Sequence, residues 1–266
     1  MKKAFQPHWW LVGLTAAASL AGFILRHQQL QTELLEDGSL APGSSLHTVL
    51  AVIAIITVAG LIGLLLPLEK KERIADHFTS SLLPNVLQIV SAVMLIAGNI
   101  LLWTEGHQPV TALAMRSPAV SDALASFLPP LGILSAVCIA AFAVCRLTNR
   151  KPSPLLYMVA SIYLVVRLIV CFQEWNIDPS IHDYCYQLLA VICCMLATFQ
   201  LAGFSFDKGK RRMTLFWTLS SVVFCSISSA DMLLRGSLDD ALINFALLLT
   251  MAVSSAQLLF VRKVPE

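Results

Sequence analysis

The feature that most constrains this chain is a series of eight long apolar stretches, which take up most of its 266 residues. Each is close to the ~20 residues that an α-helix needs to cross the ~30 Å hydrocarbon core of a bilayer. None shows strand-like alternation, and a backbone in lipid must satisfy its own hydrogen bonds, so each is predicted to be a helix. The stretches cover residues 8–26, 46–67, 83–103, 126–145, 154–174, 183–204, 213–234 and 240–261. The sequence thus predicts an all-α polytopic membrane protein, a bundle of eight transmembrane helices forming a single transmembrane domain over residues 1–266.

Composition agrees with this class and excludes others. Hydrophobic residues make up 57% of the chain and charged residues 13%, whereas an average soluble domain is about 25% charged. A soluble fold of this size could not bury so much apolar surface. No basic tract interleaved with aromatic residues is present, so the lipid bilayer, and not nucleic acid, is the expected environment.

The distribution of charge predicts the orientation of the helices. Lys and Arg are enriched in cytoplasmic segments of membrane proteins. Fourteen of the 18 basic residues fall on the termini or on the loops after even-numbered helices, and most acidic residues fall on the other loops. The loops on that acidic side contain only Arg26, Arg116 and Arg235 as basic residues. We therefore expect a multi-pass protein of the cell membrane with both termini cytoplasmic.

Short repeated segments raise the hypothesis of an internal duplication. Residues 45–47 resemble 180–182, residues 97–102 resemble 229–234, and residues 122–127 resemble 240–245, in the same order along the chain. Such matches also arise by chance in apolar sequence. If the duplication is real, the halves are residues 1–150 and 151–266, and they share one orientation because each contains four crossings. A ligand site would then be expected between the halves.

Polar residues inside the apolar stretches are the candidate functional residues. Arg167 lies about 20 Å into the fifth helix, where an unpaired charge costs roughly 2.5 kcal/mol or more. Asp231 lies at a similar outer depth in the seventh helix, and we expect these two residues to form one buried ion pair. Asp122 and Asp240 are predicted to open the fourth and eighth helices. The predicted ligand-binding set, gathered in the outer half of the bilayer, comprises Arg167, Asp231, Glu174, Tyr163, Tyr186, Gln187, Asn99 and Asn244.

Two interpretations of this polar set remain open. In one, it lines an outward-opening polar cavity for a small solute. In the other, Arg167 and Glu174 extend to the membrane surface, Asp231 pairs locally with Arg235, and the amides join helices.

Three functions follow from these interpretations. The first is a small-solute permease or substrate-binding membrane subunit. The second is an accessory or sensory protein that binds a partner membrane subunit or forms a homo-oligomer, and the third is a membrane-embedded enzyme acting on lipid. The chain has neither a His-Glu-x-x-His nor a Gly-x-Ser-x-Gly motif, which favours a non-enzymatic protein. It also has no Cys-x-x-Cys pair and no metal-ligand spacing, so we expect no metal and no cofactor.

Overall fold

A computed structural model describes residues 7–33, 45–68, 82–105, 118–148, 150, 152–153, 155–175, 185–206, 209–234 and 238–260. These residues form eight long helices and no strand, and each helix is long and apolar enough to cross a membrane. The helices are α1 (Pro7–Thr32), α2 (Ser45–Leu65), α4 (Leu82–Glu105), α5 (Pro118–Leu147), α6 (Leu155–Trp175), α7 (Cys185–Ser205), α8 (Arg211–Leu234) and α9 (Leu238–Leu259). The predicted all-α bundle of eight membrane-spanning helices is confirmed, and the chain has the build of a multi-pass integral membrane protein.

Two predicted boundaries are wrong, and one of them changes the interpretation of a charge. α1 continues to Thr32 instead of ending at residue 26, so Arg26 lies inside a helix and not in a loop. The charge of Arg26 lowers the hydropathy of this part of the sequence, so the apolar stretch ends before the helix does. α5 begins at Pro118, so Asp122 does not open that helix, whereas Asp240 does lie in the first turn of α9, as predicted.

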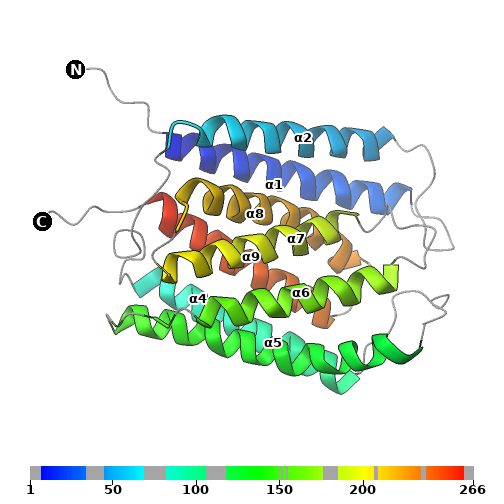
Figure 1. Cartoon of the computed structure of the whole chain (residues 1–266). Helices are drawn as coiled ribbons and strands as arrows, with labels where there is room; N and C mark the ends of the chain where they lie inside the picture. The colour runs from blue at the N-terminus through cyan, green and yellow to red at the C-terminus, as the bar shows by residue number, and fades with distance from the viewer. Residues whose placement is uncertain are drawn as a thin grey trace, which may run out of the picture.

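Six of the helices form a closed ring through their packing contacts, and Figure 1 shows the bundle from the side. In order round the ring, the packed pairs are α4–α5, α5–α6, α6–α7, α7–α8, α8–α9 and α9–α4. α1 packs on the outside of this ring against α8, and α2 packs mainly against α1. We call the end of the bundle where α1 begins and α9 ends the terminal side, and the opposite end the far side.

Small residues allow the helices at the centre of the fold to approach closely. α8 contacts α1, α7 and α9 and contains Ser220, Ser221, Ser228, Ser229 and Ala230, all buried. Helix association in a membrane depends on such close backbone packing because lipid is as apolar as the side chains. Lipid-facing surface is correspondingly large elsewhere, as on α2, where Ile55 and Ile56 are exposed.

The proposed duplication stays a prediction. α1 and α2 pack together as α6 and α7 do, and α4 and α5 as α8 and α9 do. However, α7 packs along α8, whereas α2 does not pack along α4 in the part of the chain that the structure describes. The two sets of four helices therefore differ in how they meet the rest of the bundle.

Candidate functional site

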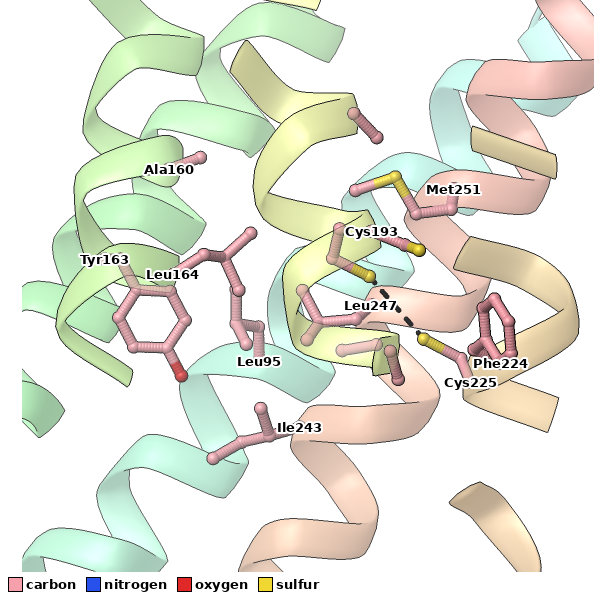
Figure 2. Close-up of a cluster of buried hydrophobic side chains, with 14 of the residues drawn as sticks. Leu95, Ala160, Tyr163, Leu164, Cys193, Phe224, Cys225, Ile243, Leu247 and Met251 are labelled. Atoms are coloured by element: carbon pink, nitrogen blue, oxygen red, sulfur yellow. Dashed lines mark hydrogen bonds between the residues drawn. The ribbon is translucent and has the colours of Figure 1, made fainter. Parts of the chain in front are cut away.

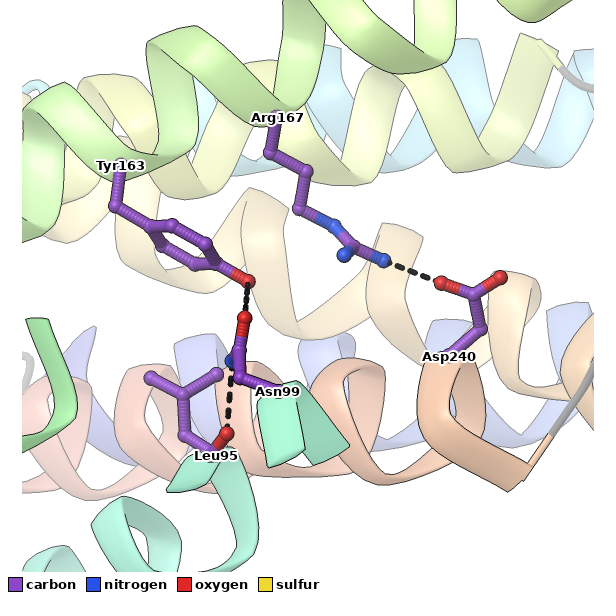
Figure 3. A network of polar contacts seen from close by, with 5 residues as sticks. All are labelled: Leu95, Asn99, Tyr163, Arg167 and Asp240. Atoms are coloured by element: carbon purple, nitrogen blue, oxygen red, sulfur yellow. Dashed lines mark hydrogen bonds and ion pairs between the residues drawn. The ribbon is translucent and has the colours of Figure 1, made fainter. Parts of the chain in front are cut away.

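An ion pair crosses the interior of the ring near its far side. The Nη2 atom of Arg167 on α6 donates to Oδ1 of Asp240 on α9 over 2.8 Å. α6 and α9 are not neighbours round the ring, so the pair joins two helices across it, as Figure 3 shows. We call these two residues the ring ion pair.

The two charges of the ring ion pair differ in their surroundings. The side chain of Arg167 is 6% exposed, whereas that of Asp240 is 21% exposed. Asp240 and Asp239 both lie in the first turn of α9, where unpaired backbone N–H groups and the helix dipole favour a carboxylate. The carboxylate of Asp240 is thus the accessible end of the pair, and the guanidinium lies deeper.

Two neutral polar residues lie next to Arg167 inside the ring. Tyr163 precedes Arg167 by one helical turn, so the two side chains leave the same face of α6. The Tyr163 hydroxyl donates to Oδ1 of Asn99 on α4 over 3.4 Å, and Nδ2 of Asn99 donates to the carbonyl of Leu95 over 2.8 Å (Figure 3). The first of these bonds is long for an O–H donor and therefore weak.

Arg167 retains hydrogen-bonding capacity that the described residues do not use. A guanidinium has five N–H donors, and Nε of Arg167 is buried without a hydrogen-bond partner among the described residues. Leaving such a donor unpaired away from water costs about 1–3 kcal/mol, and more for a charged group. We define the ring site as Arg167, Asp240, Tyr163 and Asn99. The guanidinium can bind an anionic or carbonyl group, and the carboxylate can bind a hydrogen-bond donor.

The predicted pairing of Arg167 with Asp231 is wrong. Asp231 instead pairs with Arg26 of α1, whose Nη2 and Nε lie 2.7 Å and 2.9 Å from its Oδ1. Nη1 of Arg26 donates to Oε1 of Gln29 over 2.9 Å, and the guanidinium lies 5.5 Å from the centre of the Tyr186 ring. Asp231 is four residues after Ile227, which lies against Gly22 of α1, so it faces α1 and not the ring interior.

The remaining predicted residues do not join the ring site. Nδ2 of Asn244 donates to the carbonyl of Cys225 and to Oγ of Ser229, so it ties α9 to α8. Gln187 is buried near the start of α7. The side chain of Glu174 lies outside the described residues. The structure therefore brings together Arg167, Tyr163 and Asn99 of the predicted set, and it adds Asp240.

Three leucines, which we call the leucine layer, lie beside the ring site in the buried core. Leu95, Leu164 and Leu247 belong to one buried cluster and point toward one another from α4, α6 and α9 (Figure 2). On α4, Leu95 lies between Asn99 and the polar residues nearer the terminal side, and on α9 Leu247 lies between Asp240 and Gln257. On α6, Leu164 lies between Tyr163 and Arg167. A polar solute in the ring site would have to pass these leucines to move toward the terminal side.

Sequence reasoning missed Arg26 and the partnership of Asp240. It also missed Gln88 and Tyr157, whose side chains bond to each other over 2.6 Å. The spacing of Asn85, Gln88 and Ser91 at three-residue intervals, which places polar groups on one helical face, was the available signal. No group of three His, Cys, Asp or Glu side chains that could hold a metal ion occurs among the described residues.

Comparisons with protein-family models, with curated proteins and with solved structures find no match to this chain.

Proposed function

We propose that this protein is a small-solute permease, or the substrate-binding membrane subunit of a transporter, and that the solute binds at the ring site. The observation that carries the proposal is the ring ion pair, which joins two non-neighbouring helices across the ring interior. Within the described part of the chain, Nε of Arg167 has no hydrogen-bond partner. In this proposal the termini are cytoplasmic, the membrane is the cell membrane, and the ring site opens outward.

The position of the ring ion pair favours a binding role over a purely structural one. A tie between helices is most useful where two packed faces meet, as the Arg26–Asp231 pair is between α1 and α8. The ring ion pair spans helices that do not pack along each other. Its exposed end at Asp240 gives a solute access from the far side, and the leucine layer gives the site a floor.

The chemistry of the ring site indicates what the solute carries. An acceptor such as a carboxylate, phosphate or carbonyl oxygen would satisfy Nε of Arg167. A donor group, charged or neutral, would bind the Asp240 carboxylate. Because the Tyr163–Asn99 bond is long, both side chains can exchange it for a bond to solute at little cost.

Ligand-induced stabilisation of the purified protein tests the proposal. Acetate, ethylammonium, glycine and acetamide are similar in size and represent the anionic, cationic, zwitterionic and neutral classes. A solute present at about 100 times its Kd stabilises the protein by about 2.7 kcal/mol, which a rise in the unfolding temperature would report. We expect at least one of the four to raise it, and to be taken up by proteoliposomes.

Matched double variants locate the effect. Arg167→Gln with Asp240→Asn should abolish the ligand-induced shift and the uptake. Arg26→Gln with Asp231→Asn removes an ion pair of the same kind outside the ring, and it should preserve both. If none of the four solutes shifts the unfolding temperature, or if the two double variants behave alike, the proposed function is wrong.

A further inference from the structure

A second set of polar residues lies on α4, α6 and α9 near the terminal side. Asn85 and Gln88 of α4, Tyr157 of α6 and Gln257 of α9 are all buried, with exposed fractions from 0 to 6%. We call these four residues the amide cluster. It contains no Asp, Glu, Lys, Arg or His, which distinguishes it from the ring site.

One hydrogen bond and the spacing along the helices give the heights of the members of the amide cluster, which differ by about one helical turn. Nε2 of Gln88 donates to the Tyr157 hydroxyl over 2.6 Å, again between helices that are not ring neighbours. Nearby, Oγ of Ser91 and Oγ1 of Thr250 lie 2.9 Å apart on α4 and α9, which run antiparallel. From that contact, Asn85 is six residues back along α4 and Gln257 seven residues on along α9, or about 9 and 10 Å. Asn85 and Gln257 are therefore level with each other.

The amide cluster has more hydrogen-bonding groups than the described residues satisfy. Both Oε1 and Nε2 of Gln257 and Oε1 of Gln88 are buried without a hydrogen-bond partner among those residues. Most buried polar side-chain atoms have a partner in protein or ordered water. A buried polar group left without a partner costs about 1–3 kcal/mol. These three atoms lie on two adjacent helices and differ in height by about 6 Å, and they indicate a place that can receive a polar molecule.

We propose that the amide cluster is a second binding site for a small polar solute that carries no net charge. This second site rests on the proposed function in one respect, because the two sites would be successive positions of the same solute on either side of the leucine layer. The amide oxygens and nitrogens and the Tyr157 hydroxyl can donate to and accept from a neutral or zwitterionic molecule. They offer no counter-charge to an ion.

The ring site is compatible with the same class of solute. Arg167 and Asp240 carry opposite charges 2.8 Å apart, so a zwitterion can pair with both at once and a neutral molecule can bond to both. A solute with a single net charge would leave one of the two uncompensated. The two sites together therefore favour a neutral or zwitterionic solute over an anion or a cation.

Thiol modification tests the amide cluster without a known solute. The full chain, with its seven cysteines replaced by Ala or Ser, would carry Gln257→Cys and be treated with methanethiosulfonates bearing hydroxyethyl, trimethylammonium-ethyl or sulfonatoethyl groups. Ser255→Cys is the matched control, because Ser255 is also buried at that depth but bonds within its own helix, to Ala252. Its side chain leaves α9 on the face that Asn244 turns toward α8.

We expect the neutral reagent to modify Gln257→Cys at least tenfold faster than either charged reagent, and no reagent to modify Ser255→Cys. The proposal is overturned if position 257 is not modified in the folded protein, because the side chain then only packs between helices. It is also overturned if both positions are modified equally, because position 257 is then no more accessible than the control. Faster modification by the anionic reagent would also overturn the proposal. It would indicate that the positive charge of Arg211, whose Nη2 donates to the Leu258 carbonyl, controls which reagent reaches this end of α9.

Gln257→Met, which keeps the length of the side chain and removes its polar atoms, links the site to uptake. We expect this variant to retain the ligand-induced shift of the unfolding temperature at the ring site and to lose uptake at least tenfold. Unchanged uptake would overturn the second site while leaving the proposed function intact. Modification of Gln257→Cys as expected, in a protein that no solute stabilises, would instead overturn the proposed function alone.

Discussion

The two buried ion pairs should contribute differently to stability, because one is enclosed by protein and the other has an accessible end. Arg26 is completely buried and contacts Asp231, Gln29 and the Tyr186 ring. Replacing Arg26 by Met leaves the Asp231 carboxylate, 3% exposed, without its counter-charge. Breaking a buried pair in this way costs about 3–5 kcal/mol, and loss of the cation–π contact adds up to about 2 kcal/mol.

The equivalent change in the ring ion pair should cost less. Arg167→Met leaves Asp240, whose side chain is 21% exposed and lies in the first turn of α9, where the helix dipole supplies about 0.3–1 kcal/mol. Fully exposed pairs contribute about 0–1 kcal/mol, so this partly exposed pair should contribute about 1–2 kcal/mol. We therefore expect the free energy of unfolding to fall at least about 1 kcal/mol further in Arg26→Met than in Arg167→Met.

Equilibrium unfolding in mixed detergent and SDS micelles measures this difference. The double variant Arg26→Met with Asp231→Leu should be much less destabilised than Arg26→Met alone, because no charge is left buried. The reasoning is refuted if the two single variants lose equal stability. It is also refuted if Arg26→Met costs no more than the ~0.6 kcal/mol average of polar contacts in membrane interiors.

The other predictions concern packing, thiol burial and topology. Gly98→Ala should lower the free energy of unfolding by about 1–3 kcal/mol, because its new Cβ would lie 2.7 Å from Cγ1 of Ile243 and 2.9 Å from the Asp239 carbonyl oxygen. Gly13→Ala, which meets no atom within 4 Å, should leave the unfolding temperature unchanged or raise it. Cys194 and Cys225, buried with their Sγ atoms 3.5 Å apart, should react with N-ethylmaleimide only after unfolding, as mass spectrometry would show; modification in the folded state would contradict this packing. In a Cys-depleted background, Asp37→Cys should be labelled by an impermeant thiol reagent from outside intact cells and Lys70→Cys should not, and the reverse pattern would overturn the predicted orientation.

The positions of the membrane-spanning helices could be predicted from the sequence because they depend on local properties. A run of about 20 apolar residues must become a helix in lipid wherever it packs. The prediction was wrong where a polar residue lies inside a span, since Arg26 made α1 seem six residues shorter than it is. Height along the bundle was also predictable, because Arg167 and Asn99 could be assigned to its far half from their distance along each helix.

The partner of each polar residue was decided only by the tertiary structure. Arg167 and Asp231 lie at similar depth in apolar helices, and each needs a counter-charge, yet they bond to Asp240 and Arg26. The order of helices round the ring turns Asp231 toward α1 and Arg167 toward α9. That order results from close packing of many small residues against one another. In lipid, apolar side chains on every face of a helix are equally well solvated, so hydropathy alone does not indicate which face meets which neighbour.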